Sequence, residues 1–297
     1  MMRIIVAILL LGIGFVVGAY FLSERGVIEE APRPYALEIL NSVLWMQTAA
    51  EQTALTRQTY RVGQRMLDAA LADPSWTAAV EQTQDPSGLP PAVILDVDET
   101  VLDNSSFEAQ RILEDGLFET EPWNDWCRLE EALPIPGSVE FTRYAAEKGV
   151  AVFYVTNRRH EVEEATRRNL EKHGFPLDPE EDTLYTRAER EEWDDSDKSG
   201  RRADIVSRYR VLLLFGDDLN DFVSGSRASL EERNALVEEY DGYWGSRWFM
   251  LPNPTYGGWE GALTEFDYAL EPASRLRRKY DHLRLPAGYR QPSAGSH

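Results

Sequence analysis

Residues 93–103 read VILDVDETVLD, an apolar run that ends in two aspartates one position apart. Side chains of a strand alternate between its two faces, so Asp96 and Asp98 would point the same way if the strand continued. Two carboxylates on one face repel each other unless a positive charge lies between them. The stretch therefore predicts a buried strand followed by a metal ion, by an anion bound through a metal, or by an exposed turn.

Composition narrows these alternatives. The 297 residues suffice for one large domain, or for one domain with a smaller companion, and eight tryptophans and thirteen tyrosines supply a core. The formal net charge of −20 argues against nucleic acid and against an anionic membrane surface as partners. Cys127 is the single cysteine, which excludes an intramolecular disulfide, and the four histidines lack metal-ligand spacing.

The N-terminal segment, residues 1–22, is predicted to be a signal peptide or a membrane anchor. Ile4–Leu22 is an unbroken apolar run that is long enough to span a bilayer, and Val17-Gly18-Ala19 would also serve as a cleavage site. Both alternatives predict an exported protein of the periplasm or cell envelope that touches a membrane only through this segment. Residues 23–34 (SERGVIEEAPRP) are predicted to be a linker.

Residues 35–85 form a predicted helical region. Its expected apolar faces are Leu37, Leu40 and Leu44, followed by Val62, Met66 and Ala70. We expect the helices to end at Ala72-Asp73-Pro74 and a loop to follow over residues 82–91 (QTQDPSGLPP).

The pattern changes to α/β over residues 86–270, the predicted core. Short apolar runs predict buried strands at Ala92–Leu95, Val150–Val155, Val211–Phe215 and Trp248–Leu251. Helical stretches between the strands predict a doubly wound parallel sheet, in which ligands lie at the carboxyl ends of the strands. One helix is expected to begin at Ser138 as its cap and to end at Lys148-Gly149. Residues 271–297 are a C-terminal tail without a readable signal.

Polar residues follow three of these strands. They are Asp96-Val97-Asp98, then Thr156-Asn157-Arg158, then Gly216-Asp217-Asp218-Leu219-Asn220-Asp221, and Lys198 lies between the second and the third. All of them would meet at one edge of the sheet. Carboxylates, a hydroxyl and an ammonium group at one edge indicate phosphoryl transfer with Mg²⁺, which prefers a few carboxylates plus water and phosphate oxygens.

Each group has a chemical role in such a reaction. Asp96 and Asp217 could each give the metal one oxygen, and Asp221 could hold a metal-bound water. One carboxylate could be the nucleophile, and Asp98 could protonate the leaving oxygen and later deprotonate water. Thr156 and Lys198 would neutralise the transferring group. Singly these residues are more often helix caps or solvated side chains, and only their ordered combination is specific.

The motifs DVDET, VTNR, DKS and GDDLND resemble the four motifs of the haloacid dehalogenase superfamily of phosphatases. The chain is most similar there to the class C acid phosphatases, the lipoprotein 5′-nucleotidase family. The stretches LDNSSF, IPGSVEF, FMLPNPTYGGWEG and VLWMQTAAEQTAL extend the resemblance over residues 35–270. It implies a Rossmann-like core with helices on both faces and a smaller helical part, exported in bacteria and hydrolysing phosphate monoesters with Mg²⁺, and it implies a homodimer.

The resemblance also implies residue roles. Asp96 would be the nucleophile and a metal ligand, and Asp98 the acid and base, with its backbone carbonyl on the metal. Asp217 and Asp221 would complete the metal site. Thr156, Asn157 and Lys198 would hold the phosphate, and Trp123 and Tyr256 would stack on the nucleobase or aryl group.

Two departures from the family pattern matter. The chain has no lipid-attachment cysteine, and Asp218 stands where the fourth motif of the family usually has Asn. An extra carboxylate beside the metal could strengthen cation binding or repel phosphate. Two alternatives to a phosphatase therefore stay open: a non-catalytic envelope nucleotide-binding protein, and a phosphotransferase that uses the same site.

Overall fold

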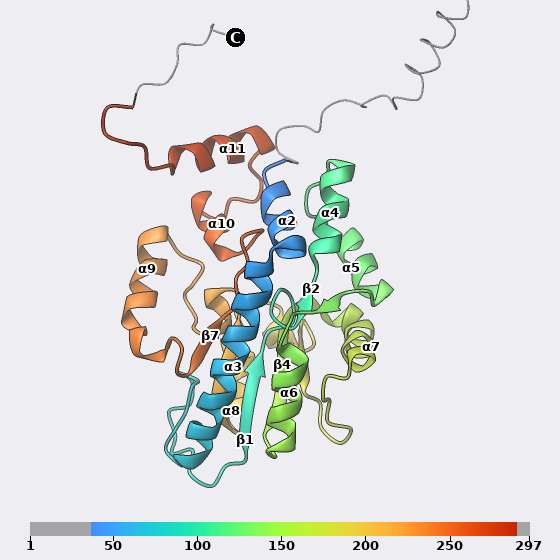
Figure 1. The fold of residues 1–297 in the computed structure, drawn as a ribbon, viewed down its shortest axis with the longest axis vertical. Helices are drawn as coiled ribbons and strands as arrows, with labels where there is room; N and C mark the ends of the chain where they lie inside the picture. Colours follow the sequence, from blue (N-terminus) through green and yellow to red (C-terminus); the bar gives the residue numbers. More distant parts are fainter. Residues whose placement is uncertain (1–36, 290–297) are drawn as a thin grey trace, which may run out of the picture.

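A five-stranded sheet forms the centre of the protein (Figure 1). The computed structural model describes residues 37–289. The strands of the sheet run in the order β5-β4-β1-β6-β7, and all four pairings are parallel. Their bounds are β1 (Pro91–Leu95), β4 (Ala151–Arg159), β5 (Leu184–Arg187), β6 (Arg210–Gly216) and β7 (Trp248–Met250). The predicted parallel α/β sheet is confirmed, and β5 is a fifth strand that the sequence patterns did not indicate.

Helices precede, connect and follow these strands. The α-helices are α2 (Leu40–Thr48), α3 (Ala50–Ala72), α4 (Ser105–Glu114), α5 (Thr120–Leu129), α6 (Ser138–Glu147), α7 (Glu163–His173), α8 (Ser199–Val206), α9 (Leu230–Glu239), α10 (Gly258–Leu263) and α11 (Pro272–Asp281). Short 3₁₀ turns are η1 (His160–Val162), η2 (Glu191–Trp193), η3 (Leu219–Asp221) and η4 (Asp241–Tyr243), and β2 (Leu102–Asp103) pairs antiparallel with β3 (Leu133–Pro134).

Both faces of the sheet are buried, because successive side chains of β1 and of β4 belong to different apolar clusters. Leu95 of β1 shares one cluster with Tyr60 of α3 and Phe141 of α6. Ile94, its neighbour in sequence, shares the other cluster with Ile205 of α8 and with Trp248. Burial on two faces explains why the strands read as continuous apolar runs and do not alternate.

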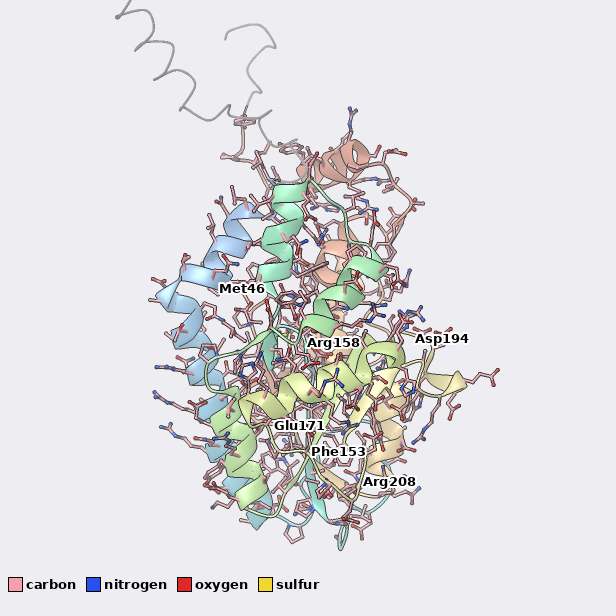
Figure 2. The ribbon with its side chains drawn as sticks, turned by 90° about the vertical axis from the view of Figure 1, so that its right-hand side faces the viewer. Met46, Phe153, Arg158, Glu171, Asp194 and Arg208 are labelled. Carbon is pink, nitrogen blue, oxygen red and sulfur yellow. The ribbon has the colours of Figure 1, made fainter. Side chains whose placement is uncertain are left out.

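The helical region packs on the core, but with other residues than expected. Leu37 and Leu44 are 42% and 45% exposed, and Val43 and Met46 are the buried residues of α2. Figure 2 labels Met46. The prediction of the Leu37–Leu40–Leu44 face was wrong because extended backbone at Ala49 separates α2 from α3. The sequence does not show that the helix ends at Thr48, so the spacing of the leucines assigns the wrong buried face to the short α2.

Helix α3 shows a similar shift of its buried stripe. Tyr60, Gly63, Leu67 and Ala70 are buried, whereas Val62 and Met66 lie half-buried beside them. Gly63 lies against Phe215 of β6, where a Cβ would overlap the ring. The expected end of this helix at Ala72 is confirmed.

The start of α6 also differs from the expectation. Gly137, with φ +99°, occupies the cap position, and Ser138 is the first helical residue. The Ser138 hydroxyl donates to the Ile135 carbonyl at 2.7 Å, so it closes the preceding turn and caps no helical N–H. The expected end at Lys148-Gly149 is confirmed, with Gly149 at φ +74°.

The carboxyl ends of the strands point toward the part of the molecule that α2, α4, α5 and α10 form (Figure 1). None of the helices within residues 37–289 is long and apolar enough to cross a membrane. The predicted signal or anchor, residues 1–22, and the predicted linker, residues 23–34, lie outside the described residues.

Candidate active site

Asp96 lies at the end of β1, and its carboxylate is buried. Lys198 is the residue just before α8. Its ammonium group donates to Asp96 Oδ1 and to Asp221 Oδ1, the latter at 2.6 Å. Lys198 is itself buried. Burial alone would lower the pKa of Lys198, but the carboxylates of Asp221 and Asp96 outweigh it and raise that pKa. The lysine therefore stays charged between two acidic groups from different strand ends.

Three carboxylates converge here. Asp96, Asp217 and Asp221 each offer one oxygen, and these oxygens lie within 4.8 Å of one another. The backbone of Asp217 and Asp218 holds Asp221 in place, because both N–H groups donate to its Oδ2, at 3.1 and 2.9 Å. Gly216, the last residue of β6, permits this approach, since a Cβ there would overlap the Asp221 carboxylate.

This group of oxygens fits a divalent cation. Burial and the neighbouring carboxylates raise the pKa of Asp96 to about 7 even though Lys198 opposes the shift. Burial, together with Asp221 and Asp96, also raises the pKa of Asp217 well above its usual range. Because their pKa values are raised even beside Lys198, Asp96 and Asp217 need a further cation to be ionised together. Oxygen-only ligands that come from few side chains suit a hard ion such as Mg²⁺.

Asp98 lies two residues beyond Asp96 but has different partners. The buried Arg158 guanidinium donates to Asp98 Oδ1 from Nε at 2.9 Å and pairs with it through Nη2 at 2.8 Å. The Asn104 amide donates to the same oxygen at 2.9 Å. The hydroxyl of Thr156 reaches the other oxygen, Oδ2, at 3.3 Å. Oδ1 is thus saturated with donors, whereas Oδ2 has only the Thr156 hydroxyl as a partner.

Thr156 and Asn157, in the last part of β4, divide between the site and its support. Thr156 touches Asp98, whereas the Asn157 amide donates to the Ser196 carbonyl at 3.0 Å. Arg201 of α8 donates to Asn157 Oδ1 at 2.7 Å and to the Thr156 carbonyl at 2.5 Å. The Asn157 side chain therefore ties the end of β4 to the loop that carries Lys198.

The two predicted stacking aromatics lie on different elements. Trp123 of α5 is half-buried, and its ring contacts Phe107 edge-on at 5.1 Å and the Arg158 guanidinium at 5.5 Å. Tyr256 follows β7, and its N–H donates to Asn253 Oδ1 at 3.3 Å. The amide of Asn253 in turn donates to Asp217 Oδ2 at 2.8 Å. Each aromatic is thus joined to a carboxylate of the site through one intermediate residue.

Asp218 points away from the three carboxylates. Its Oδ1 accepts the Asn220 N–H at 3.0 Å, and its Oδ2 accepts the Gly258 N–H at 2.6 Å. The buried Arg233 approaches the same Oδ2 at 3.5 Å. The unusual carboxylate therefore fastens η3 to the start of α10, and it adds no oxygen to the cluster.

Comparison with known proteins decides the family. The model of the HAD superfamily subfamily IIIB, acid phosphatase, matches residues 28–259. The chain belongs to this family of acid phosphatases. The class C acid phosphatase from Bacillus anthracis is a solved structure with 34% identity and a TM-score of 0.74, and the match covers 84% of this chain and 98% of that one. The same enzyme with tungstate bound matches with the same values. The chain is accordingly a phosphoric monoester hydrolase.

Sequence reasoning missed several residues of this acid phosphatase site. Arg158, near the end of β4, was visible in the motif VTNR but received no role, and Figure 2 shows it in the middle of the molecule, unlike the peripheral Asp194. Asn104, Arg201 and Asn253 also escaped notice, although Asn104 and Asn253 lie inside the family-like stretches LDNSSF and FMLPNPTYGGWEG. One partner of each residue lies far away in the sequence: Arg158 is 54 residues from Asn104, Thr156 is 45 from Arg201, and Asp217 is 36 from Asn253. Local spacing does not reveal such contacts.

Proposed function

We propose that this phosphatase hydrolyses nucleotide or aryl phosphate monoesters with Mg²⁺, through an aspartyl-phosphate on Asp96. The observation that carries the proposal is the convergence of Asp96, Lys198 and Asp221 in one buried contact. A buried carboxylate next to a buried ammonium can meet a phosphoryl group whose charge the ammonium neutralises.

In the first step, an oxygen of Asp96 attacks phosphorus and the bond from phosphorus to the leaving oxygen breaks. The leaving oxygen takes a proton from Asp98, whose Oδ2 is free of strong donors except the Thr156 hydroxyl. Lys198 then exchanges a carboxylate partner for a phosphate oxygen, and Thr156 turns its hydroxyl toward another. The product of this step is an aspartyl-phosphate and a free alcohol.

In the second step, Asp98 takes a proton from water, and the water oxygen attacks the phosphorus of the aspartyl-phosphate. The bond between phosphorus and the Asp96 oxygen breaks, which restores the carboxylate. Asp96, Asp217 and Asp221 would hold Mg²⁺, with the Asp98 backbone carbonyl as a further ligand, and the ion supplies charge neutralisation at the phosphate. Arg158 and Asn104 keep Asp98 oriented through both proton transfers.

The proposed substrate class rests on Trp123 and Tyr256. Flat rings of nucleobases and aryl groups stack on such side chains with little demand on substituents. That the Bacillus anthracis relative is reported with tungstate, a tetrahedral oxyanion, supports a phosphate-sized site in this family. We further propose that residues 1–22 export the protein or anchor it in the cell envelope, and that the family-like chain forms a homodimer.

Phosphate release from nucleoside 5′-monophosphates, p-nitrophenyl phosphate and glycerol phosphate tests the proposal, with Mg²⁺ and with EDTA. We expect release only with the metal, fastest for the substrates that carry a flat ring. The Asp96→Asn variant should lose at least about a thousandfold in kcat because its amide is no nucleophile. Asp85→Asn is the matched control, because Asp85 lies in the exposed loop before β1.

Three results would contradict parts of the proposal. Turnover that survives Asp96→Asn would refute the nucleophile, and turnover in EDTA would refute the metal. Equal rates for glycerol phosphate and nucleotides would refute the aromatic subsite. Product analysis with an added alcohol shows whether the aspartyl-phosphate also passes its phosphate to acceptors other than water.

A further inference from the structure

Residues 272–289, hereafter the basic segment, differ in charge from the rest of the protein. They comprise α11 and the eight residues after it. The basic residues are Arg275, Arg277, Arg278, Lys279 and Arg284, against the single acidic residue Asp281, which gives this segment a net charge of +4. The chain as a whole carries −20. The whole-chain charge therefore does not describe the surface at this end.

Two of these basic residues hold α11 on the molecule. Lys279 donates to Glu260 Oε1 of α10 at 2.6 Å and to Glu38 just before α2. Arg275 donates to the Leu270 carbonyl at 3.0 Å. Arg277 and Arg278 point outward: both are exposed, and Arg278 has only a 3.8 Å approach to the exposed Glu265. An exposed pair of this length contributes little, so these two charges are available to a partner.

Large apolar side chains accompany the outward charges. Tyr280, Leu283, Leu285 and Tyr289 are each more than half exposed within ten residues. A solvated tail has no physical need for two leucines and two tyrosines among its arginines. Basic residues next to exposed leucine and aromatic side chains are typical of segments that lie in the interface of an anionic bilayer.

The position of the basic segment favours a bilayer over other partners. Lys279 contacts Glu38, so α11 lies where the chain leaves the described structure toward the apolar run Ile4–Leu22. Only 14 residues separate Leu22 from Leu37, and 14 residues span at most about 50 Å when fully extended. A bilayer that holds the apolar run therefore comes within reach of the basic segment, which lies with α2 at the upper end of the view in Figure 1.

We infer that the basic segment docks on a bilayer that contains anionic phospholipids, with Arg277 and Arg278 at the headgroups and Tyr280, Leu283 and Leu285 at the acyl boundary. The inference rests on the proposed anchor in residues 1–22: with that segment held in the bilayer, this second contact fixes the orientation of the enzyme. The carboxyl ends of the strands, with the active site, then face the membrane side of the molecule, and the loop before β1 faces away.

A fluorescent label at residue 283 of the full-length chain tests the inference. Cys127 is buried, so a Leu283→Cys variant is labelled selectively with a nitrobenzoxadiazole dye, whose emission shifts to the blue in lipid. Vesicles of phosphatidylcholine alone are compared with vesicles that also contain phosphatidylglycerol. A label at Ser87→Cys, in the exposed loop before β1, serves as the position control.

Charge variants provide the matched comparison. Arg277→Gln/Arg278→Gln removes the two outward charges of α11, and glutamine keeps the helix propensity. Arg57→Gln/Arg61→Gln removes two exposed charges from α3, which runs away from α11 in Figure 1. Since each basic residue at an anionic surface contributes roughly a fivefold gain, the α11 pair should lower the ratio of docked to free label by about 25-fold. The α3 pair should leave it unchanged.

The inference predicts that the emission of the label at residue 283 shifts to the blue only with the vesicles that contain phosphatidylglycerol. The label at residue 87 should show no shift with either kind of vesicle. Three results overturn the inference. The first is no emission shift at residue 283 although the chain sediments with the anionic vesicles, and the second is an equal shift with both kinds of vesicle. The third is an equal loss of docking in the α11 and the α3 charge variants. A shift that depends on protein concentration in the absence of anionic lipid would assign the segment to a second copy of this acidic chain and would also overturn it. Failure of the chain to sediment with vesicles would refute the tether on which the geometry rests, and with it the inference. Phosphate release by the same variants reports separately on the proposed function.

Discussion

Asp98 and Arg158 form a nearly buried pair on which the geometry of the proposed acid and base depends. Arg158 also donates to Asn104 Oδ1 at 3.1 Å and to the Thr166 hydroxyl at 3.2 Å. Arg158→Met removes these donors and leaves a carboxylate that is only 17% exposed. Breaking such a pair costs about 3 kcal/mol of unfolding free energy, near the lower end of the range because Asp98 retains some solvent contact.

The neighbouring Arg159 provides the control for this prediction. Its side chain is exposed, with a 3.8 Å approach to Asp194, so Arg159→Met should change the unfolding free energy by no more than about 0.5 kcal/mol. Urea unfolding of both variants measures the difference, and kcat should fall only for Arg158→Met. Equal stability of the two would mean that Arg158 does not hold Asp98.

Asp218 stands where the family usually has Asn, and its replacement by Asn tests whether this difference changes the metal site. Asn in its place still accepts the Asn220 N–H through its single oxygen as a cap, but its NH2 group cannot accept the Gly258 N–H, and the weak pair with Arg233 is lost. We expect Asp218→Asn to cost about 1 kcal/mol of stability and to leave the Mg²⁺ dependence of activity unchanged. Asp217→Asn is the contrast and should weaken it strongly. A clear change in Mg²⁺ affinity in Asp218→Asn would show that its charge acts on the ion.

The sequence indicated the residues to which the proposed reaction assigns the chemistry, but not the residues that hold them in place. Asp96 and Asp217 follow apolar strands and Thr156 follows the apolar part of β4, and such apolar runs can be recognised from the chain alone. Arg158 and Arg201 could have been read as solvated cations, since burial of a guanidinium becomes visible only when distant segments fold together. For the same reason, the side chain of Asn157 proves to hold the Lys198 loop, which its position in VTNR did not indicate.

At the scale of elements, the junction between β6 and η3 controls the cluster. Gly216 has no room for a side chain beside Asp221, so Gly216→Ala must displace the carboxylate that Lys198 and two backbone N–H groups hold. We expect a large loss of activity and about 1–3 kcal/mol of stability, as for overpacking of a tight site. Gly242→Ala in η4 is the control, because nothing lies within 4 Å of its added Cβ. Similar activities of the two variants would contradict the tight fit.

The prediction of elements succeeded where burial on two faces made the pattern simple. β1, β4, β6 and β7 are apolar runs, whereas β5 (LYTR) has four residues and only one aliphatic side chain. Its tyrosine and threonine favour a strand, but four residues form no apolar run, and the pairing with β4 at Tyr154 and Val155 makes it part of the sheet. The prediction of the buried face of α2 was wrong for a related reason. Contact with α4 and the break at Ala49 determine which side of α2 is buried, and the spacing of its leucines does not.

At the scale of the whole molecule, charge is distributed unevenly in a way that suits an anionic substrate. A chain of net charge −20 repels phosphate in general, yet the described part buries Lys198, Arg158 and Arg201 around the carboxylates of the site. The pKa of Arg201 is lowered to about 10, chiefly by burial, and it remains charged at neutral pH. These three cations offset most of the charge of the four aspartates of the site, and the proposed Mg²⁺ would make the site positive toward phosphate.

The same burial couples the stability of the whole protein to pH and to the metal. Without a metal, the pKa of Asp96 is about 7 in the folded state, against about 3.9 in an unfolded chain. Between these values the folded protein keeps a proton that the unfolded chain releases, so the contribution of Asp96 to stability falls as pH rises through this window.

Mg²⁺ binds the ionised carboxylates and competes with their protons. The increase in Tm on addition of Mg²⁺ should therefore be small near about pH 5 and larger near about pH 7.5. Calorimetry with and without the ion isolates this site, because other groups contribute equally to both scans. Asp217→Asn should abolish most of the increase. A metal-induced increase that is the same at both pH values would show that the carboxylates are already ionised in the absence of the metal, held so by Lys198 alone.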